Sequence, residues 1–125
     1  MLTARAENHL RGRDDLDDTI ARLQAFQDAG ADVLYAPALR TPEQIATVVD
    51  ALEKPVNVLA LPGVPPIAEL AEIGVARVSV GGAFAAVAYA ALIGAATELR
   101  DRGTYEYSQA AREGSAAMRG AFASS

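Results

Sequence analysis

The sequence predicts an α/β fold built from four parallel β-α units, and three observations lead to that prediction. Short β-branched runs begin near Leu2, Val33, Val56 and Val78, about 22 to 31 residues apart, which is the repeat length of β-α units. Helical patterns fill the intervals between them. Hydrophobic residues make up 51% of the chain and charged residues 22%, a balance typical of folded globular proteins. This spacing is compatible with two architectures, an open doubly wound sheet and part of a closed barrel, and does not decide between them.

The first unit begins with a short strand, Leu2–Ala6, whose polar side chains fall on one face. Asp14 or Asp15 is placed to cap the following helix, because a carboxylate can accept hydrogen bonds from the first free N–H groups. Gly30 is expected to end that helix in the left-handed conformation. The predicted apolar stripe of this helix consists of Leu16, Ile20, Leu23 and Phe26.

The second unit has the clearest local signals. A buried strand is expected over Ala31–Ala36, followed by a helix with Thr41 at the N-cap, Pro42 at its first position and Gln44 three residues past the cap. A further strand, Val56–Leu61, begins the third unit. The apolar stripe of the intervening helix has the spacing i, i+3, i+4 and i+7 and comprises Ile45, Val48, Val49 and Leu52.

The remaining units run toward the C-terminus. A short helix over residues 67–73 is expected to end at Gly74, and a fourth strand follows over Ala76–Val80. A long Ala-rich helix is predicted over Phe84–Arg102, and a last helix over Tyr107–Met118.

Composition excludes several classes of function. The net charge of -5 argues against nucleic-acid binding, because neutralising phosphates needs a basic face. Without cysteine the chain has no disulfides, thiolate metal sites or cysteine nucleophile, and a single histidine excludes multi-histidine metal sites. The first residues show no signal peptide, and the most apolar window, Val75–Ala96, is mostly Ala and Gly. We therefore expect a cytoplasmic protein with no membrane partner.

Five segments occur in a fixed order that is specific as a set. They are Leu2–Glu7, Asp17–Ala29, Ala29–Asp32, Pro55–Ala60 and Gly74–Gly82. In this order they resemble the C-terminal half of the isocitrate lyase/phosphoenolpyruvate mutase superfamily. The resemblance runs from Met1 to about Thr104 and is nearest to members of unsettled substrate.

The resemblance implies that the four units are strands five to eight of a TIM-type (β/α) barrel, so the fold is a partial barrel followed by C-terminal helices. It implies a barrel half over residues 1–104 and a helix with a flexible tail over 105–125. Members of the superfamily bind Mg²⁺ and a small oxo- or hydroxy-carboxylate, and they break or form C–C or P–C bonds through an enolate. Their metal-binding motif lies on earlier strands, so the Mg²⁺ ligands are expected to be absent from this chain. Leu59 and Leu61 stand where well-characterised lyases have Asn and Thr.

Arg5 is the candidate catalytic residue, and it is also a candidate substrate-binding residue. The resemblance places it at the substrate-contacting arginine of the family, at the mouth of the barrel, and a guanidinium can offer two aligned donors to a carboxylate or enolate. The alternative is a plain ion pair with Glu7, which shares its face and is itself a substrate-binding candidate. Asn57 is a further substrate-binding candidate, and the alternative for it is a satisfied buried amide.

Gly81 and Gly82 complete the candidate substrate-binding set, because backbone N–H groups at a strand-to-helix turn can hold a phosphate. Close packing at the turn is the alternative. The Ala-rich helix over 83–102 is expected to pack against another subunit in a homo-oligomer.

His9 and an acidic cluster carry weaker signals. His9, the only imidazole, is more typical of a surface or hydrogen-bonded histidine than of a catalytic one. The acidic residues at the start of the first helix are explained by capping and by the helix dipole rather than by a metal site. These residues are Asp14, Asp15, Asp17 and Asp18.

Three functions are compatible with the sequence. The first is a Mg²⁺-dependent lyase or mutase present as a truncated half that lacks the metal motif, since the chain opens inside a strand, and this half alone is expected to show no turnover. The second is a non-catalytic truncated product that self-associates into a dimeric half-barrel, because four β-α units leave two free sheet edges. The third is an independent open-sheet domain that binds a small anion.

Overall fold

The computed structural model describes residues 1–123 of the chain. The chain divides into two compact units, Met1–Gly81 and Gly82–Ser125, and each unit is described by itself. The predicted division between residues 104 and 105 stays a prediction.

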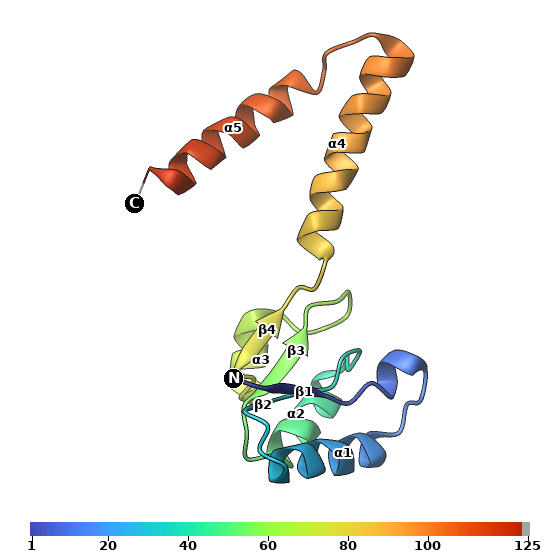
Figure 1. Ribbon diagram of the computed structural model, residues 1–125, viewed down its shortest axis with the longest axis vertical. Helices are drawn as coiled ribbons and strands as arrows, with labels where there is room; N and C mark the ends of the chain where they lie inside the picture. Colours follow the sequence, from blue (N-terminus) through green and yellow to red (C-terminus); the bar gives the residue numbers. More distant parts are fainter. Residues whose placement is uncertain (124–125) are drawn as a thin grey trace. The chain divides into compact units, whose positions relative to one another are not determined.

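The first unit contains a four-stranded sheet in the order β1-β2-β3-β4, and every neighbouring pair is parallel (Figure 1). The strands are β1 (Thr3–Arg5), β2 (Val33–Tyr35), β3 (Val56–Leu59) and β4 (Arg77–Ser79). The predicted class, four parallel β-α units, is confirmed. Because the order in the sheet equals the order in the chain, each crossover joins adjacent strands, as in a (β/α) barrel.

The strands are shorter than the sequence predicts. The third was expected to reach Leu61 but ends at Leu59, because Pro62 lacks an N–H for the ladder and turns the chain away. The two central strands are almost wholly buried, whereas the edge strands are only partly buried. Burial is therefore high in the middle of the sheet and low at its edges.

Three α-helices and a short 3-10 helix connect the strands. A 3-10 helix, η1 (His9–Arg11), follows β1, and the α-helices are α1 (Leu16–Asp28), α2 (Pro42–Asp50) and α3 (Ile67–Ile73). Their positions agree with the predicted helices to within a few residues.

Local capping explains where two of these helices begin. Asp15 is the N-cap of α1, and its side chain accepts a hydrogen bond of 2.9 Å from the backbone N–H of Asp18. Thr41 caps α2 in the same way, accepting a bond of 3.2 Å from the N–H of Gln44. Gly30, just past the end of α1, has φ of +96°, which is the left-handed conformation predicted for it.

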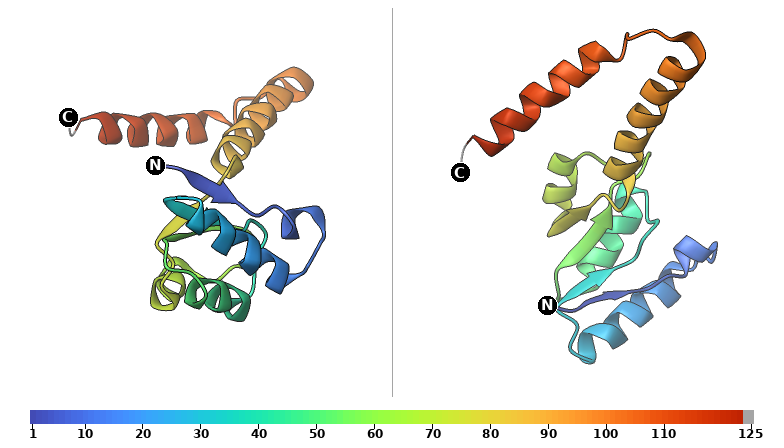
Figure 2. Two further views of the ribbon diagram at one scale, coloured as in Figure 1. Left: turned by 60° about the horizontal axis from the view of Figure 1, so that its bottom comes forward. Right: turned by 45° about the horizontal axis from the view of Figure 1, so that its top comes forward.

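The hydrophobic core lies between one face of the sheet and the three α-helices, which lie on the same side of it (Figure 2). Side chains from β2 and β3 meet side chains from each helix, and burying them supplies the main stabilisation of this unit. The central members of this core are Leu34, Val56 and Val58 from the strands and Leu23, Ile45, Val48 and Leu70 from the helices.

The opposite face of the sheet carries no helix from the Met1–Gly81 unit. Successive side chains of a strand point to opposite faces, so the strand residues between the core positions all point toward this second face. Parallel sheets are normally covered on both faces. We call it the uncovered face, meaning that no helix of this unit covers it; in a (β/α) barrel the corresponding face of the strands points to the interior.

The second unit comprises α4 (Ala83–Arg102) and α5 (Ser108–Phe122). The helix α4 starts at Ala83, one residue before the predicted Phe84, and α5 ends at Phe122, beyond the predicted Met118. Glu98 holds the turn between the helices: its carboxylate accepts hydrogen bonds from the Thr104 hydroxyl at 2.7 Å and from the N–H groups of Glu106 and Tyr107 at 2.7 and 3.1 Å. These hydrogen bonds, of which that from Thr104 has the largest effect, hold the pKa of the Glu98 carboxyl below its usual value.

The helix α4 exposes a large apolar surface. Within residues 1–123 it alone is long and apolar enough to cross a membrane, with a mean hydropathy of 1.3 over 18 residues, and one such helix is a weak indication. The sequence predicts instead a packing helix, and that prediction stays open. The exposed apolar side chains are Phe84, Val87, Tyr89, Leu92, Ile93 and Leu99.

Candidate functional site

Four side chains form one row across the uncovered face of the sheet. The register pairs Arg5 of β1 with Tyr35 of β2, Tyr35 with Asn57 of β3, and Asn57 with Arg77 of β4. Directly paired residues on neighbouring strands point to the same face. The sheet therefore places an arginine at each edge, with an aromatic ring and an amide between them. We call these four residues the arginine row.

The arginine row lines a cavity of about 310 Å³ on this face. The cavity includes two positively charged side chains and no carboxylate, although the chain as a whole carries a net charge of -5. An anionic ligand is the kind of molecule that this local charge attracts. The full lining consists of Thr3, Arg5, Tyr35, Asn57, Leu59, Arg77, Ser79 and Gly81.

Arg5 is held from two sides. Its Nε donates a hydrogen bond of 2.8 Å to Oε1 of Glu7, and its guanidinium carbon lies 5.0 Å from the centre of the Tyr35 ring. The ion pair that was the alternative for Arg5 is thus present. It uses Nε, however, and the terminal Nη donors have no hydrogen-bond partner among the described residues. The contacts to Glu7 and Tyr35 therefore orient the guanidinium while leaving donors for a ligand.

Asn57 is 2% exposed, and its amide is oriented by a short hydrogen-bond chain. The Ser79 hydroxyl lies 3.5 Å from the Val58 carbonyl, to which it donates its single proton, so its oxygen accepts from Asn57 Nδ2 at 3.0 Å. Asn57 Oδ1 has no partner among the described residues. The satisfied buried amide that was the alternative for Asn57 is therefore only half satisfied, and a buried unpartnered oxygen costs about 1–3 kcal/mol.

Arg77 is the cation that sequence reasoning missed. Its Nη1 lies 3.4 Å from the Thr3 hydroxyl, so the side chain extends from the β4 edge toward β1 over the uncovered face. No ion pair joins it to any carboxylate within residues 1–123. The alternation of Arg77 and Ser79 along β4 was the available signal, but only the register reveals that Arg77 is next to Asn57.

The predicted site residues are only partly brought together. Arg5, Asn57 and Gly81 line the same cavity, and Glu7 is attached to it through Arg5. A Cβ at Gly81 would lie 3.7 Å from the Leu59 side chain, an ordinary contact, so this glycine is not required there by lack of space. Gly82 belongs to the second unit, and its role as a substrate-binding residue stays a prediction.

His9 and the aspartate cluster have structural contacts. The His9 side chain is buried, with Nδ1 3.4 Å from Asp14 Oδ1. Asp15 caps α1, and Asp18 pairs with Arg22 at 2.7 Å, an interaction that lowers the pKa of the Asp18 carboxyl. These contacts support the capping interpretation of the cluster.

The described residues do not fit a magnesium site. Mg²⁺ needs several oxygen ligands in an octahedral arrangement, commonly with carboxylates among them. Within residues 1–123 no three His, Asp or Glu side chains converge, and the cavity of the arginine row contains two cations. The expectation that the Mg²⁺ ligands are absent from this chain stays a prediction.

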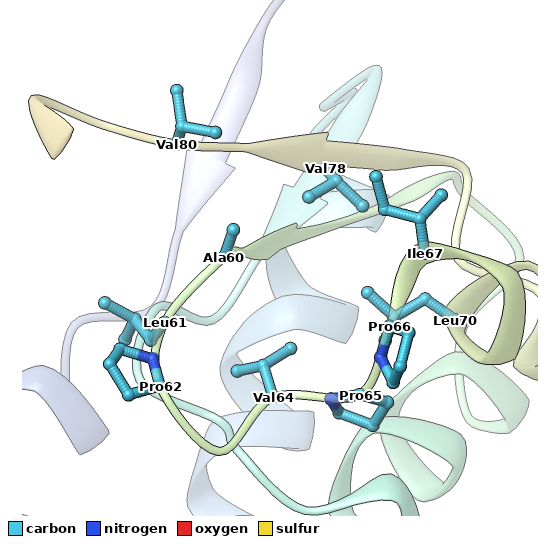
Figure 3. Close-up of a pocket in the computed structure, with 10 residues that line it drawn as sticks. All are labelled: Ala60, Leu61, Pro62, Val64, Pro65, Pro66, Ile67, Leu70, Val78 and Val80. Carbon is cyan, nitrogen blue, oxygen red and sulfur yellow. The ribbon is translucent and has the colours of Figure 1, made fainter. Parts of the chain in front are cut away.

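A second cavity, of about 430 Å³, lies between α3, β4 and the loop after β3 (Figure 3). The side chains that line it are all apolar, so it offers no polar side chain to orient a substrate or to move a proton. We therefore assign the candidate site to the arginine row. The lining residues are Ala60, Leu61, Pro62, Val64, Pro65, Pro66, Ile67, Leu70, Val78 and Val80.

Comparison with known proteins gives concordant results. The family model described as phosphoenolpyruvate phosphomutase matches residues 1–100. A "putative lyase/mutase" from Burkholderia cenocepacia J2315 has a similar structure, with a TM-score of 0.82 and 56% identity over 88% of this chain and 40% of that one. Oxaloacetate acetylhydrolase bound to 3,3-difluorooxalacetate has a TM-score of 0.72 and 32% identity, over 85% of this chain and 37% of that one.

A protein of Mycobacterium tuberculosis without an assigned function is 40% identical over 92 residues, which is 72% of this chain and 35% of the relative. The chain thus spans about 35–40% of the length of these three proteins. The structural matches confirm the predicted partial barrel of the TIM type.

Proposed function

The chain belongs to the phosphoenolpyruvate phosphomutase family, and on that premise we propose that it is the carboxylate-binding half of a lyase or mutase barrel. One observation carries the proposal: the cavity on the uncovered face contains two arginines and no carboxylate. The family relationship favours a small oxo- or hydroxy-carboxylate as the substrate, with a C–C or P–C bond broken or formed. Oxaloacetate acetylhydrolase and 2,3-dimethylmalate lyase are among the structurally similar proteins.

In this proposal Arg5 binds the substrate carboxylate through its Nη donors. Glu7 holds Nε, and the Tyr35 ring supports the face of the guanidinium, so little side-chain freedom is lost when the anion binds. If an enolate forms in the reaction, the same fixed positive charge stabilises the negative charge that develops on its oxygen. Arg5 is thus both the binding and the catalytic residue that this chain contributes.

The cofactor proposed from the family is Mg²⁺, which as a bound ion would polarise the substrate oxygens. Because the described residues do not fit a magnesium site, we assign no step to it here. We likewise propose a cytoplasmic location with neither a nucleic-acid nor a membrane partner, and a homo-oligomer that uses the exposed helix α4.

A second candidate function is a non-catalytic dimer of half-barrels. It is favoured by the two edge strands, β1 and β4, each of which has one side free of strand neighbours in the sheet. Two copies that pair β1 with the β4 of the other copy would form eight parallel strands. Sedimentation equilibrium together with amide hydrogen exchange tests this candidate: a dimer whose β1 amides are protected from exchange supports it, and a monomer at high concentration excludes it.

The main proposal is tested with two small molecules of equal shape and different charge. We expect the purified chain to bind butyrate measurably better than butyramide in isothermal titration calorimetry, because the Arg5 guanidinium attracts the carboxylate and gains much less from the neutral amide. Equal affinities for the two compounds would show that the cavity does not select for negative charge.

A further inference from the structure

We propose that Arg77 is a second anion-binding residue of this site, so that a ligand with two acid groups is bound from both edges of the sheet. This inference rests on the proposed function, because it adds a second subsite to the one that Arg5 provides. The juxtaposition that carries it is the arginine row, in which Arg5 on β1 and Arg77 on β4 line one cavity.

The two arginines differ in their contacts. Arg5 is already paired with Glu7, so its charge is partly compensated within the protein. Arg77 has no ion pair in the part of the chain that the structure describes, and its one hydrogen bond, to the Thr3 hydroxyl, is long at 3.4 Å. A guanidinium with free donors beside a cavity is suited to bidentate binding of a carboxylate or phosphonate.

The groups around Arg77 also favour an acid group. Asn57, its register partner, is a nearly fully buried polar side chain on the floor of the cavity, and Ser79 holds the amide in place. None of the side chains that line the cavity is negatively charged, so no fixed charge competes with a ligand for Arg77. The unpartnered Asn57 Oδ1 can accept from the guanidinium or from a hydroxyl of the ligand, which would remove its unsatisfied state.

The volume of the site is sufficient for such a ligand. About 310 Å³ accommodates a diacid of four or five carbon atoms. The two arginines are separated by two intervening strands, and both long side chains line the same space. A ligand with acid groups at its two ends can therefore contact both cations, whereas a monoacid can satisfy only one.

A purely structural role for Arg77 makes a different prediction. If the residue serves only to tie β4 to Thr3, its replacement should disturb the sheet and weaken every ligand equally. If it binds the second acid group, its replacement should weaken a diacid and leave a monoacid unaffected. The split between the two ligands therefore separates the two roles.

The test uses succinate and butyrate, which have the same carbon length and differ by one acid group. With the full chain we expect calorimetry to show succinate binding about tenfold more tightly than butyrate, in line with a charge-assisted hydrogen bond. In Arg77→Gln the affinity for succinate should fall about tenfold, to that of butyrate, while the affinity for butyrate stays unchanged. Arg77→Lys should retain part of the preference, because it keeps the charge and loses the bidentate geometry.

A control variant completes the experiment. Arg40→Gln removes an arginine outside the cavity and should change neither affinity. Circular dichroism of each variant checks that the fold is kept.

The outcomes distinguish a failure of the Arg77 subsite from a failure of the proposed function. Equal binding of succinate and butyrate by the unmodified chain, or equal loss of both in Arg77→Gln, overturns the role of Arg77 and leaves the Arg5 carboxylate site in place. If the unmodified chain binds neither compound, both the Arg77 subsite and the proposed function are wrong.

Discussion

Replacing Leu34 with alanine is expected to destabilise the Met1–Gly81 unit by about 2–5 kcal/mol, the range for leucines removed from a tightly packed core. Leu34 lies on the central strand β2, is 0% exposed and belongs to the core shared with the three helices. A unit of this size has a total stability of roughly 4–12 kcal/mol, so the loss is a large part of it. Urea unfolding followed by circular dichroism measures the change.

Leu10→Ala provides the matched control, because Leu10 belongs to the same unit and is 46% exposed. Its effect should stay within about 0.5 kcal/mol. If Leu34→Ala and Leu10→Ala unfold at the same urea concentration, the core is not where the structure locates it.

Replacing Arg5 with glutamine is expected to weaken butyrate binding about tenfold. The variant loses a charge-assisted interaction with the carboxylate, and partial exposure of the Arg5 side chain, 49%, keeps the effect at the lower end of the range for such bonds. Glutamine retains much of the side-chain length, so packing on Tyr35 changes little. Calorimetric titration of the unmodified and the variant chain with butyrate gives the ratio of the two affinities.

Arg5→Lys and added salt act as controls for this prediction. Lysine keeps the charge and should recover part of the affinity, and a rise in ionic strength should weaken binding to the unmodified chain more than to Arg5→Gln. Unchanged butyrate affinity in Arg5→Gln would remove Arg5 from the site.

The helix starts and the order of the elements could be predicted because their signals are local. Asp15 and Thr41 each bond an N–H three residues later, so the capping pattern is complete within four residues. The ends of the strands were harder to predict than the starts of the helices. The strand β3 stops at Leu59 although the apolar run continues, because pairing with a neighbouring strand and the turn at Pro62 decide where the ladder ends.

The candidate site could be predicted only in part, because it too depends on how neighbouring strands pair. Arg5, Asn57 and Gly81 were identified, the first through the resemblance to a family, and all three line the cavity. The role of Arg77 depends on which residue of β3 it faces, and that register is set by packing of the whole sheet rather than by the local sequence.

The most direct test of the central claim is to locate the bound carboxylate by NMR during a titration of the chain with butyrate. Shifts should concentrate on the uncovered face of the sheet, at the Arg5 Nε–H group, the Tyr35 amide and the Asn57 side-chain amide, while Leu23 and Ile45 in the core stay unchanged. Shifts that map to the helical side or to the apolar cavity beside α3, with none at Arg5, would contradict the assignment of the arginine row as the binding site.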